Sequence, residues 1–177
     1  GAATASNGAV GLYHIEHLTP EAVQQGEALI RDGAPVYVID DAELQRVRES
    51  YPCVWKNLNA KPKLCFMGCP HMTLHQLIDT TERVEASLKA HSQRKVCIPT
   101  VFTAAPGVIE AFEKTEYAPR LRNTGVVLSY ICPLMYMNNP LSKAMPVITS
   151  SNKLRTYTTA RYYTEEEIIT MITKGAN

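Results

Sequence analysis

Two short segments of the sequence place a cysteine directly after an apolar run and directly before a proline. The first is Gly68-Cys69-Pro70-His71, which follows the apolar residues 64–67. The second is Cys132-Pro133, which follows the apolar residues 126–131. A thiolate can ligate a metal or act as a nucleophile. Because ligands of a parallel α/β sheet bind outside the carboxyl ends of its strands, two cysteines at two such ends could converge on one metal.

The cysteines as a set indicate reduced thiols rather than a disulfide framework. Their number is odd and their spacing is irregular, which favours a cytoplasmic protein with some thiols free for metal binding or catalysis. Cys65 and Cys97 fall inside apolar runs and are predicted to be core residues. Burial as a small apolar side chain is the alternative for Cys69 and Cys132 as well. The five cysteines are Cys53, Cys65, Cys69, Cys97 and Cys132.

A second group of polar residues, Thr149-Ser150-Ser151-Asn152-Lys153, closes another apolar run. Hydroxyl groups, exposed backbone amides and a lysine can hold a carboxylate or a phosphate. A polar surface turn is the alternative. His71 lies beside Cys69, just before the helix cap expected at Thr73, and is a further candidate. Ser150, Ser151, Lys153 and His71 are therefore the predicted substrate-binding residues.

The composition is that of an ordinary globular protein and narrows the choice of function. The 177 residues include 18 basic and 17 acidic side chains, and 45% of residues are hydrophobic. The net charge of +1 gives no sign of a nucleic-acid or membrane-surface partner. No apolar run approaches the roughly 18 residues of a membrane span. The length predicts a single domain over 1–177.

The predicted elements place these residues at the edge of a sheet. Strands alternate with helices through short links, which predicts an α/β fold: a three-layer, doubly wound and mainly parallel sheet with helices on both faces. The continuous apolar strands agree, since both of their faces are covered. Strands are predicted over 9–15, 35–39, 64–68, 96–102, 126–132 and 146–150. Helices are predicted over 19–33, 40–49, 73–91, 105–121 and 164–175.

Taken in order, these segments resemble the aconitase X family, which includes phosphomevalonate dehydratase large subunits and cis-3-hydroxy-L-proline dehydratases. The resemblance rests on residues 1–14, on Gly68-Cys69-Pro70-His71, on Cys132 and on residues 149–153, and it spans essentially the whole chain. It implies an aconitase-domain-like fold. It also implies an iron–sulfur-dependent hydro-lyase that dehydrates a small hydroxy acid, such as a hydroxyproline or phosphomevalonate type substrate.

The resemblance further implies that Cys69 and Cys132 are two of the three cysteine ligands of a 2Fe-2S or 4Fe-4S cluster. The third ligand and a swivel domain, or separate small subunit, have no counterpart here. We therefore expect a fragment of a longer chain that is inactive alone. The sequence departs from the family at Ser151-Asn152, where Asn-Ser is usual, and at Tyr130-Ile131, where Asp-Thr is usual.

Two other functions stay open. One is a non-catalytic doubly wound domain that binds a small anionic ligand at its strand ends. The other is a thiol enzyme with Cys69 as nucleophile and His71 as base. The second ranks last, because side chains two positions apart in a turn rarely face each other. The sequence offers no candidate for the general base that the proposed dehydration requires.

Overall fold

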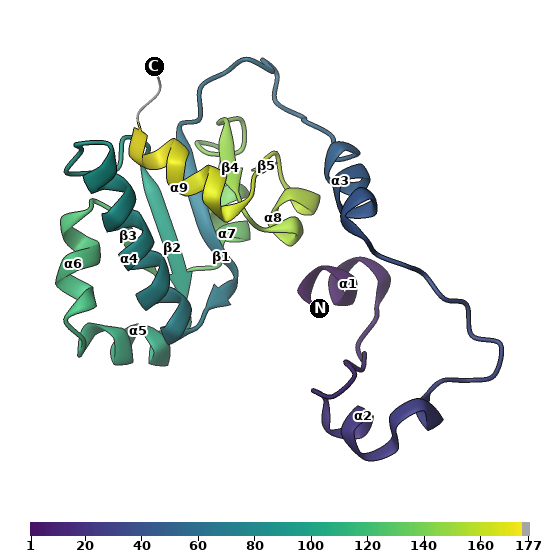
Figure 1. The fold of residues 1–177 in the computed structure, drawn as a ribbon. Helices are drawn as coiled ribbons and strands as arrows, with labels where there is room; N and C mark the ends of the chain where they lie inside the picture. Colours follow the sequence, from purple (N-terminus) through teal and green to yellow (C-terminus); the bar gives the residue numbers. More distant parts are fainter. Residues whose placement is uncertain (175–177) are drawn as a thin grey trace. The chain divides into compact units, whose positions relative to one another are not determined.

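A computed structural model of the chain describes residues 1–174, and these form two compact units (Figure 1). The first unit covers Gly1–Pro52 and the second begins at Cys53. The sheet of the α/β fold lies wholly in the second unit. No helix within residues 1–174 is both long enough and apolar enough to cross a membrane.

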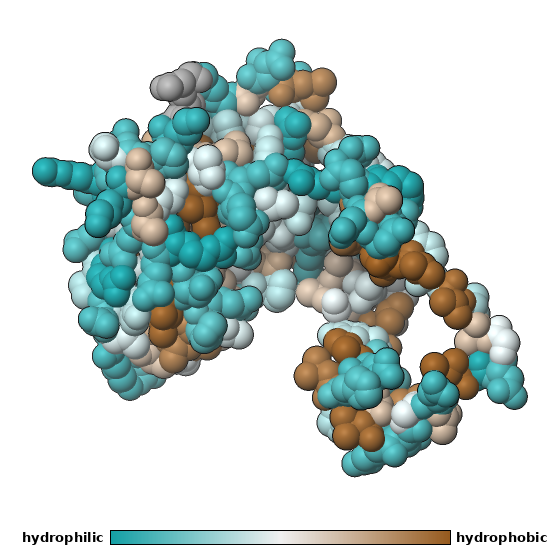
Figure 2. Space-filling model, in the orientation of Figure 1, coloured by the Kyte–Doolittle hydropathy of each residue, from teal (hydrophilic) through white to brown (hydrophobic). Residues whose placement is uncertain are grey.

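The first unit consists of short helices joined by extended chain. Asp40 begins the last of these helices as predicted, because its carboxylate accepts a hydrogen bond of 2.8 Å from the Glu43 amide. None of the four helices buries a residue. Figure 2 shows the resulting apolar patches on this unit. The helices are α1 (Ala2–Gly8), α2 (Pro20–Gln25), the 3₁₀ helix η1 (Gly26–Leu29) and α3 (Asp41–Glu49).

The prediction of strands over 9–15 and 35–39 is wrong. Within the described residues neither segment pairs with a strand, and Val36 is 89% exposed. Apolar and β-branched residues favour a strand only where a half-buried sheet surface receives them. The helix predicted over 19–33 is also shorter, because Gly26 adopts φ +54° and interrupts it, and the helical chain ends at Leu29.

The second unit contains a five-stranded parallel sheet within the part of the chain that the structure describes. From β1, the second and third strands are added in turn on one side of the sheet. The chain then returns, and the last two strands are added on the other side of β1. This order is that of a doubly wound sheet, as predicted. The strands are β1 (Leu64–Met72), β2 (Thr100–Ala104), β3 (Val127–Ser129), β4 (Val147–Thr149) and β5 (Arg161–Tyr162), in the spatial order β3-β2-β1-β4-β5.

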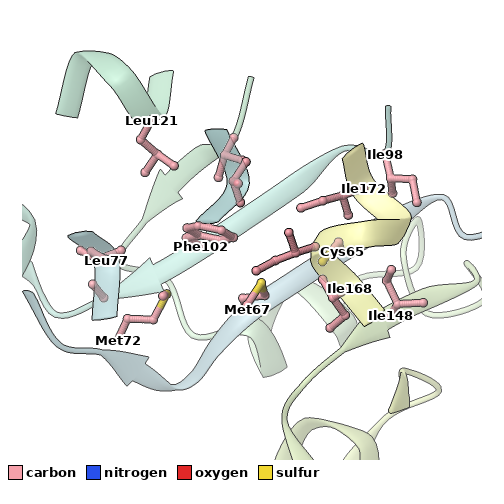
Figure 3. Close-up of a cluster of buried hydrophobic side chains, with 14 of the residues drawn as sticks. Cys65, Met67, Met72, Leu77, Ile98, Phe102, Leu121, Ile148, Ile168 and Ile172 are labelled. Atoms are coloured by element: carbon pink, nitrogen blue, oxygen red, sulfur yellow. The ribbon is translucent and has the colours of Figure 1, made fainter. Parts of the chain in front are cut away.

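Helices cover both faces of this sheet. The side chains of β1 alternate between two cores: Cys65 and Met67 pack on one side with Ile168 of α9, and Phe66 packs on the other with Leu154 of α8. Figure 3 shows the larger core, formed between the sheet and α4, α6 and α9. The helices are α4 (Leu74–Ala90), α5 (Pro106–Glu113), α6 (Tyr117–Asn123) and α9 (Glu165–Lys174) around the larger core, and α7 (Pro133–Met137) and α8 (Asn152–Tyr157) around the smaller one.

Several predicted boundaries need correction in the second unit. The strand predicted over 96–102 begins only at Thr100, after Pro99, which has no amide to donate to a ladder. Cys97 is consequently not a core residue: it is exposed, and its thiol donates to the Ile172 carbonyl at 3.1 Å. The helix predicted over 105–121 is two helices, α5 and α6, and β5 was not predicted. The predicted helix end at Gly175 lies outside the described residues.

Candidate functional site

The carboxyl ends of β1 and β4 form the topological switch point of the sheet. The two strands pair in parallel as far as Phe66 and Thr149. The chain then leads from β1 to α4 on one face of the sheet and from β4 to α8 on the other face. In open α/β sheets, ligands bind in the crevice that opens at this point. Cys69 and His71 stand at the end of β1, and Ser150 directly follows β4. The fold therefore brings these two predicted segments to one place.

A pocket of about 180 Å³ opens there. Three of the predicted site residues line it together: Cys69, His71 and Ser150. Its other polar walls come from helices, with Gln76, Asp79 and Thr80 of α4 and Glu165 of α9.

Gly68 sets the path of the chain into this pocket. It adopts φ +103°, and a Cβ added there would lie 2.7 Å from Thr103 Oγ1 of β2. The Thr103 hydroxyl in turn donates a hydrogen bond of 2.5 Å to the Gly68 carbonyl. Only glycine accepts both the left-handed φ and the close approach. The ladder between β1 and β2 is irregular from Met67 to Met72, so Cys69 and His71 leave the regular pleat.

The loop after His71 is fixed by the start of α4. Thr73 Oγ1 accepts from the Gln76 amide at 3.2 Å, and the Gln76 side chain accepts from the Thr73 amide at 2.9 Å. The predicted helix cap at Thr73 is confirmed, and the two hydrogen bonds together form a capping box. His71 itself is exposed and lines the pocket. His75, in the first turn of the helix, is also exposed but does not line the pocket.

Cys132 reaches the same edge of the sheet from β3. It is the residue before α7, and α7 packs in the smaller core that Cys69 also contacts. Tyr136 of α7 stacks on Phe66 of β1, with ring centroids 5.4 Å apart. The Tyr136 hydroxyl lies 3.0 Å from Ser129 Oγ at the end of β3. Both cysteines are half-buried free thiols, but Cys132 does not line the pocket.

Ser151 and Lys153 lie beside the pocket rather than in its lining. Ser151 is 5% exposed and begins α8, where its hydroxyl oxygen accepts a hydrogen bond of 3.0 Å from the Leu154 amide. Its own amide donates to Thr149 Oγ1 at 3.1 Å. Lys153 is half-buried in the first turn of α8. Of the two serines, Ser150 has the direct access to the pocket.

Two carboxylates in the pocket wall were missed by the sequence analysis. Arg83 pairs with both: its guanidinium lies 3.5 Å from Asp79 and 3.1 Å from Glu165, and it also pairs with Glu166 at 2.9 Å. Burial acts to lower the pKa of Arg83, but the hydrogen bond and charge of Glu165, with the charges of Glu166 and Asp79, outweigh it and raise the pKa. Acidic residues on helices are common on protein surfaces. No sequence pattern therefore distinguished Asp79 and Glu165 as pocket residues.

The donor set fits part of an iron–sulfur site. Clusters of this kind are held by cysteine thiolates, and Cys69 and Cys132 offer two thiols on one edge of the sheet. Among residues 1–174, no three or more histidine, cysteine, aspartate or glutamate side chains are grouped so as to hold a metal ion. Cys69 and Cys132 are therefore two candidate ligands and do not form a complete metal site within the described residues.

The second unit is a doubly wound α/β domain with its candidate site at the switch point, and comparison with known proteins agrees with this class. Aconitase X from Thermococcus kodakaraensis, solved in a holo form, shares the fold with a TM-score of 0.59 and 20% identity. The similarity covers 77% of this chain and 34% of that one.

Sequence comparison points the same way, although no protein-family profile matches the chain. The phosphomevalonate dehydratase large subunit of Thermococcus kodakarensis is 32% identical over 82 residues, which are 46% of this chain and 19% of that protein. The large subunit from Methanothermobacter thermautotrophicus is 34% identical over 77 residues, covering 44% and 18%. The one from Methanosarcina mazei is 33% identical over 82 residues, covering 46% and 18%.

These findings confirm the resemblance to the aconitase X family and the predicted fold class. The matched stretch spans less than a fifth of the length of each of these large subunits.

Proposed function

We propose that this chain is the C-terminal part of the large subunit of an aconitase-like hydro-lyase that depends on an iron–sulfur cluster. The observation that supports this most is the grouping of Cys69, His71 and Ser150 around one pocket at the switch point of the sheet. The relatives are named as phosphomevalonate dehydratase large subunits. A small hydroxy acid, of the phosphomevalonate or hydroxyproline type, is the proposed substrate.

Cys69 and Cys132 are the proposed cluster ligands within this chain. Both thiols are free and half-buried, and the stacking of Tyr136 on Phe66 ties the segment after Cys132 to β1. When bound, the cluster would supply a Lewis acid for the departing hydroxyl group. The third thiolate would come from a part of the protein beyond this chain.

The chain's own polar residues would hold the substrate. Ser150 and His71 can donate hydrogen bonds into the pocket, toward the carboxylate or phosphate of a hydroxy acid. Lys153 would add positive charge from the first turn of α8, and the Ser151 hydroxyl still has its own proton to donate while it caps that helix. The pocket volume of about 180 Å³ lies below the roughly 300–1,000 Å³ of pockets that take drug-sized molecules, so the pocket has room only for a small ligand.

The swivel domain or small subunit of the family is the proposed protein partner. The relatives are named as large subunits, which supports a second, smaller component. With the partner and the third ligand absent, this chain would not turn over substrate by itself. The cytoplasm is the proposed compartment, because the five cysteines are unpaired within the described structure.

The second candidate function is a non-catalytic domain that binds a small anion. The same pocket supports it, because His71 and Ser150 can hold an anion without a metal. The presence of a cluster separates the two candidates.

The test is anaerobic expression of the full-length protein together with its partner subunit, followed by measurement of iron, acid-labile sulfide and the visible spectrum. The dehydratase proposal expects iron and sulfide in matching amounts and a broad absorbance above the protein band. A colourless protein that stays free of iron after reconstitution would favour the anion-binding domain.

A further inference from the structure

A second and larger pocket, of about 620 Å³, lies at the opposite edge of the sheet. Its walls come from the segments that lead into the strands: Lys143 and Met145 precede β4, and Thr159 precedes β5. Since every described strand pairing is parallel, the residues before the strands gather at the amino edge. The Cys69 pocket lies at the carboxyl edge, so the two sites are distinct. We call this second site the amino-edge pocket.

The walls of the amino-edge pocket are tied together by hydrogen bonds. Trp55 is 7% exposed, and its indole Nε1 donates to the Thr159 carbonyl at 2.9 Å. The Thr159 hydroxyl donates in turn to the Lys143 carbonyl at 3.0 Å. The guanidinium of Arg161 lies over the Trp55 ring, 5.7 Å from its centroid. The segments around Trp55, Lys143 and Thr159 are thereby tied together around one cavity.

The lining combines an apolar surface with positive charge. Trp55, Pro140 and Met145 supply apolar area, while Lys56 and Lys143 supply two exposed ammonium groups. No aspartate or glutamate lines the pocket. Throughout residues 1–174, neither lysine has a carboxylate within 4.0 Å. Two unpaired ammonium groups beside an apolar cavity are complementary to an anionic head carried on an apolar body.

We propose that the amino-edge pocket binds a small amphipathic anion, in which a carboxylate or phosphate head is joined to an apolar chain. Lys56 and Lys143 hold the head, and Met145 and Pro140 contact the chain beside the Trp55 ring. The volume falls within the roughly 300–1,000 Å³ of pockets that take small molecules. This site uses none of the residues proposed for dehydration, so its ligand binding can be tested independently of that activity.

Trp55 makes the proposal directly measurable, because it is the only tryptophan in the chain. Its emission is followed while the 177-residue chain is titrated with octanoate, with octyl phosphate and with octyltrimethylammonium, all below micelle formation. We expect octanoate or octyl phosphate to shift the emission saturably, and the stronger of the two identifies the head group. The cationic probe has the same chain and is expected to leave the emission unchanged.

A pair of double variants tests the role of the lysines. Lys56→Gln/Lys143→Gln is expected to weaken binding of the better anion by about tenfold or more, which corresponds to roughly 1.4 kcal/mol. Lys89→Gln/Lys95→Gln removes the same charge from exposed positions outside the pocket and is expected to keep the affinity. The proposal is overturned if no anion shifts the emission, if the cationic probe shifts it equally, or if both double variants bind alike.

Discussion

Tyr136 stacks on Phe66, with ring centroids 5.4 Å apart and ring planes at 25°. Phe66 lies in β1, three residues before Cys69, and Tyr136 lies in α7, four residues after Cys132. This contact joins the segment that follows Cys132 to the strand that carries Cys69. We therefore expect the arrangement of the two candidate cluster ligands to depend on this aromatic pair.

Replacement of Tyr136 tests that dependence. Tyr136→Ala removes the stacking and the contact with Ser129, and we expect it to lower the free energy of unfolding by about 1–3 kcal/mol, since the ring is only half-buried. Tyr136→Phe keeps the ring and loses only the hydroxyl contact, so its loss should be about 0.5–1.5 kcal/mol. Urea unfolding of the chain measures both. Equal losses in the two variants would show that the stacking contributes nothing.

Gly68→Ala should destabilise the chain by about 2 kcal/mol or more. The new Cβ would clash with Thr103. Residue 68 would also have to keep φ +103°, a backbone conformation that residues with a side chain rarely adopt. Gly107→Ala is the matched control: it has open space around it, lies within α5 and should stabilise the chain by up to about 1 kcal/mol. Thermal unfolding compares the two. A neutral Gly68→Ala would contradict the close approach between β1 and β2.

The buried thiol of Cys65 predicts an alkaline loss of stability. Burial raises the pKa of this thiol from 9.0 to about 12. The unfolded chain therefore releases the proton first, and the stabilisation that is fully present below about pH 9 is lost progressively toward pH 12. Between pH 8 and pH 10 this group alone should lower the free energy of unfolding by about 1.4 kcal/mol.

Cys65→Ala isolates this effect from the other groups that titrate at alkaline pH. The variant is expected to start less stable at pH 8, because it leaves a small cavity, and to lose about 1.4 kcal/mol less than the parent chain on going to pH 10. Denaturant unfolding at the two pH values gives the comparison. Parallel losses in both proteins would mean that Cys65 is not protected from ionisation in the folded state.

Local pattern was sufficient to predict the central strands and the edge at which the site lies. The apolar runs before Cys69, Cys132 and Ser150 end at the carboxyl edge because parallel strands share that edge, and the sequence shows each run. The caps at Asp40 and Thr73 were equally local, since each is a contact between residues three positions apart.

What the sequence did not reveal depends on tertiary contacts. The segments around 9–15 and 35–39 have the composition of strands, but no strand among the described residues pairs with them. Asp79 and Glu165 reach the pocket only because α4 and α9 pack side by side, which no spacing shows. The amino-edge pocket joins Trp55 to Thr159 by a hydrogen bond across 104 positions, so it too was invisible in the sequence.

The central claim is that Cys69 and Cys132 ligate an iron–sulfur cluster, and the most direct measurement is iron per protein in three variants of the full-length protein prepared anaerobically with its partner. Cys69→Ser and Cys132→Ser are each expected to lower bound iron sharply and to remove the visible absorbance. Cys97→Ser changes an exposed thiol outside the site and should keep the iron of the parent protein. Unchanged iron in both Cys69→Ser and Cys132→Ser would contradict the claim.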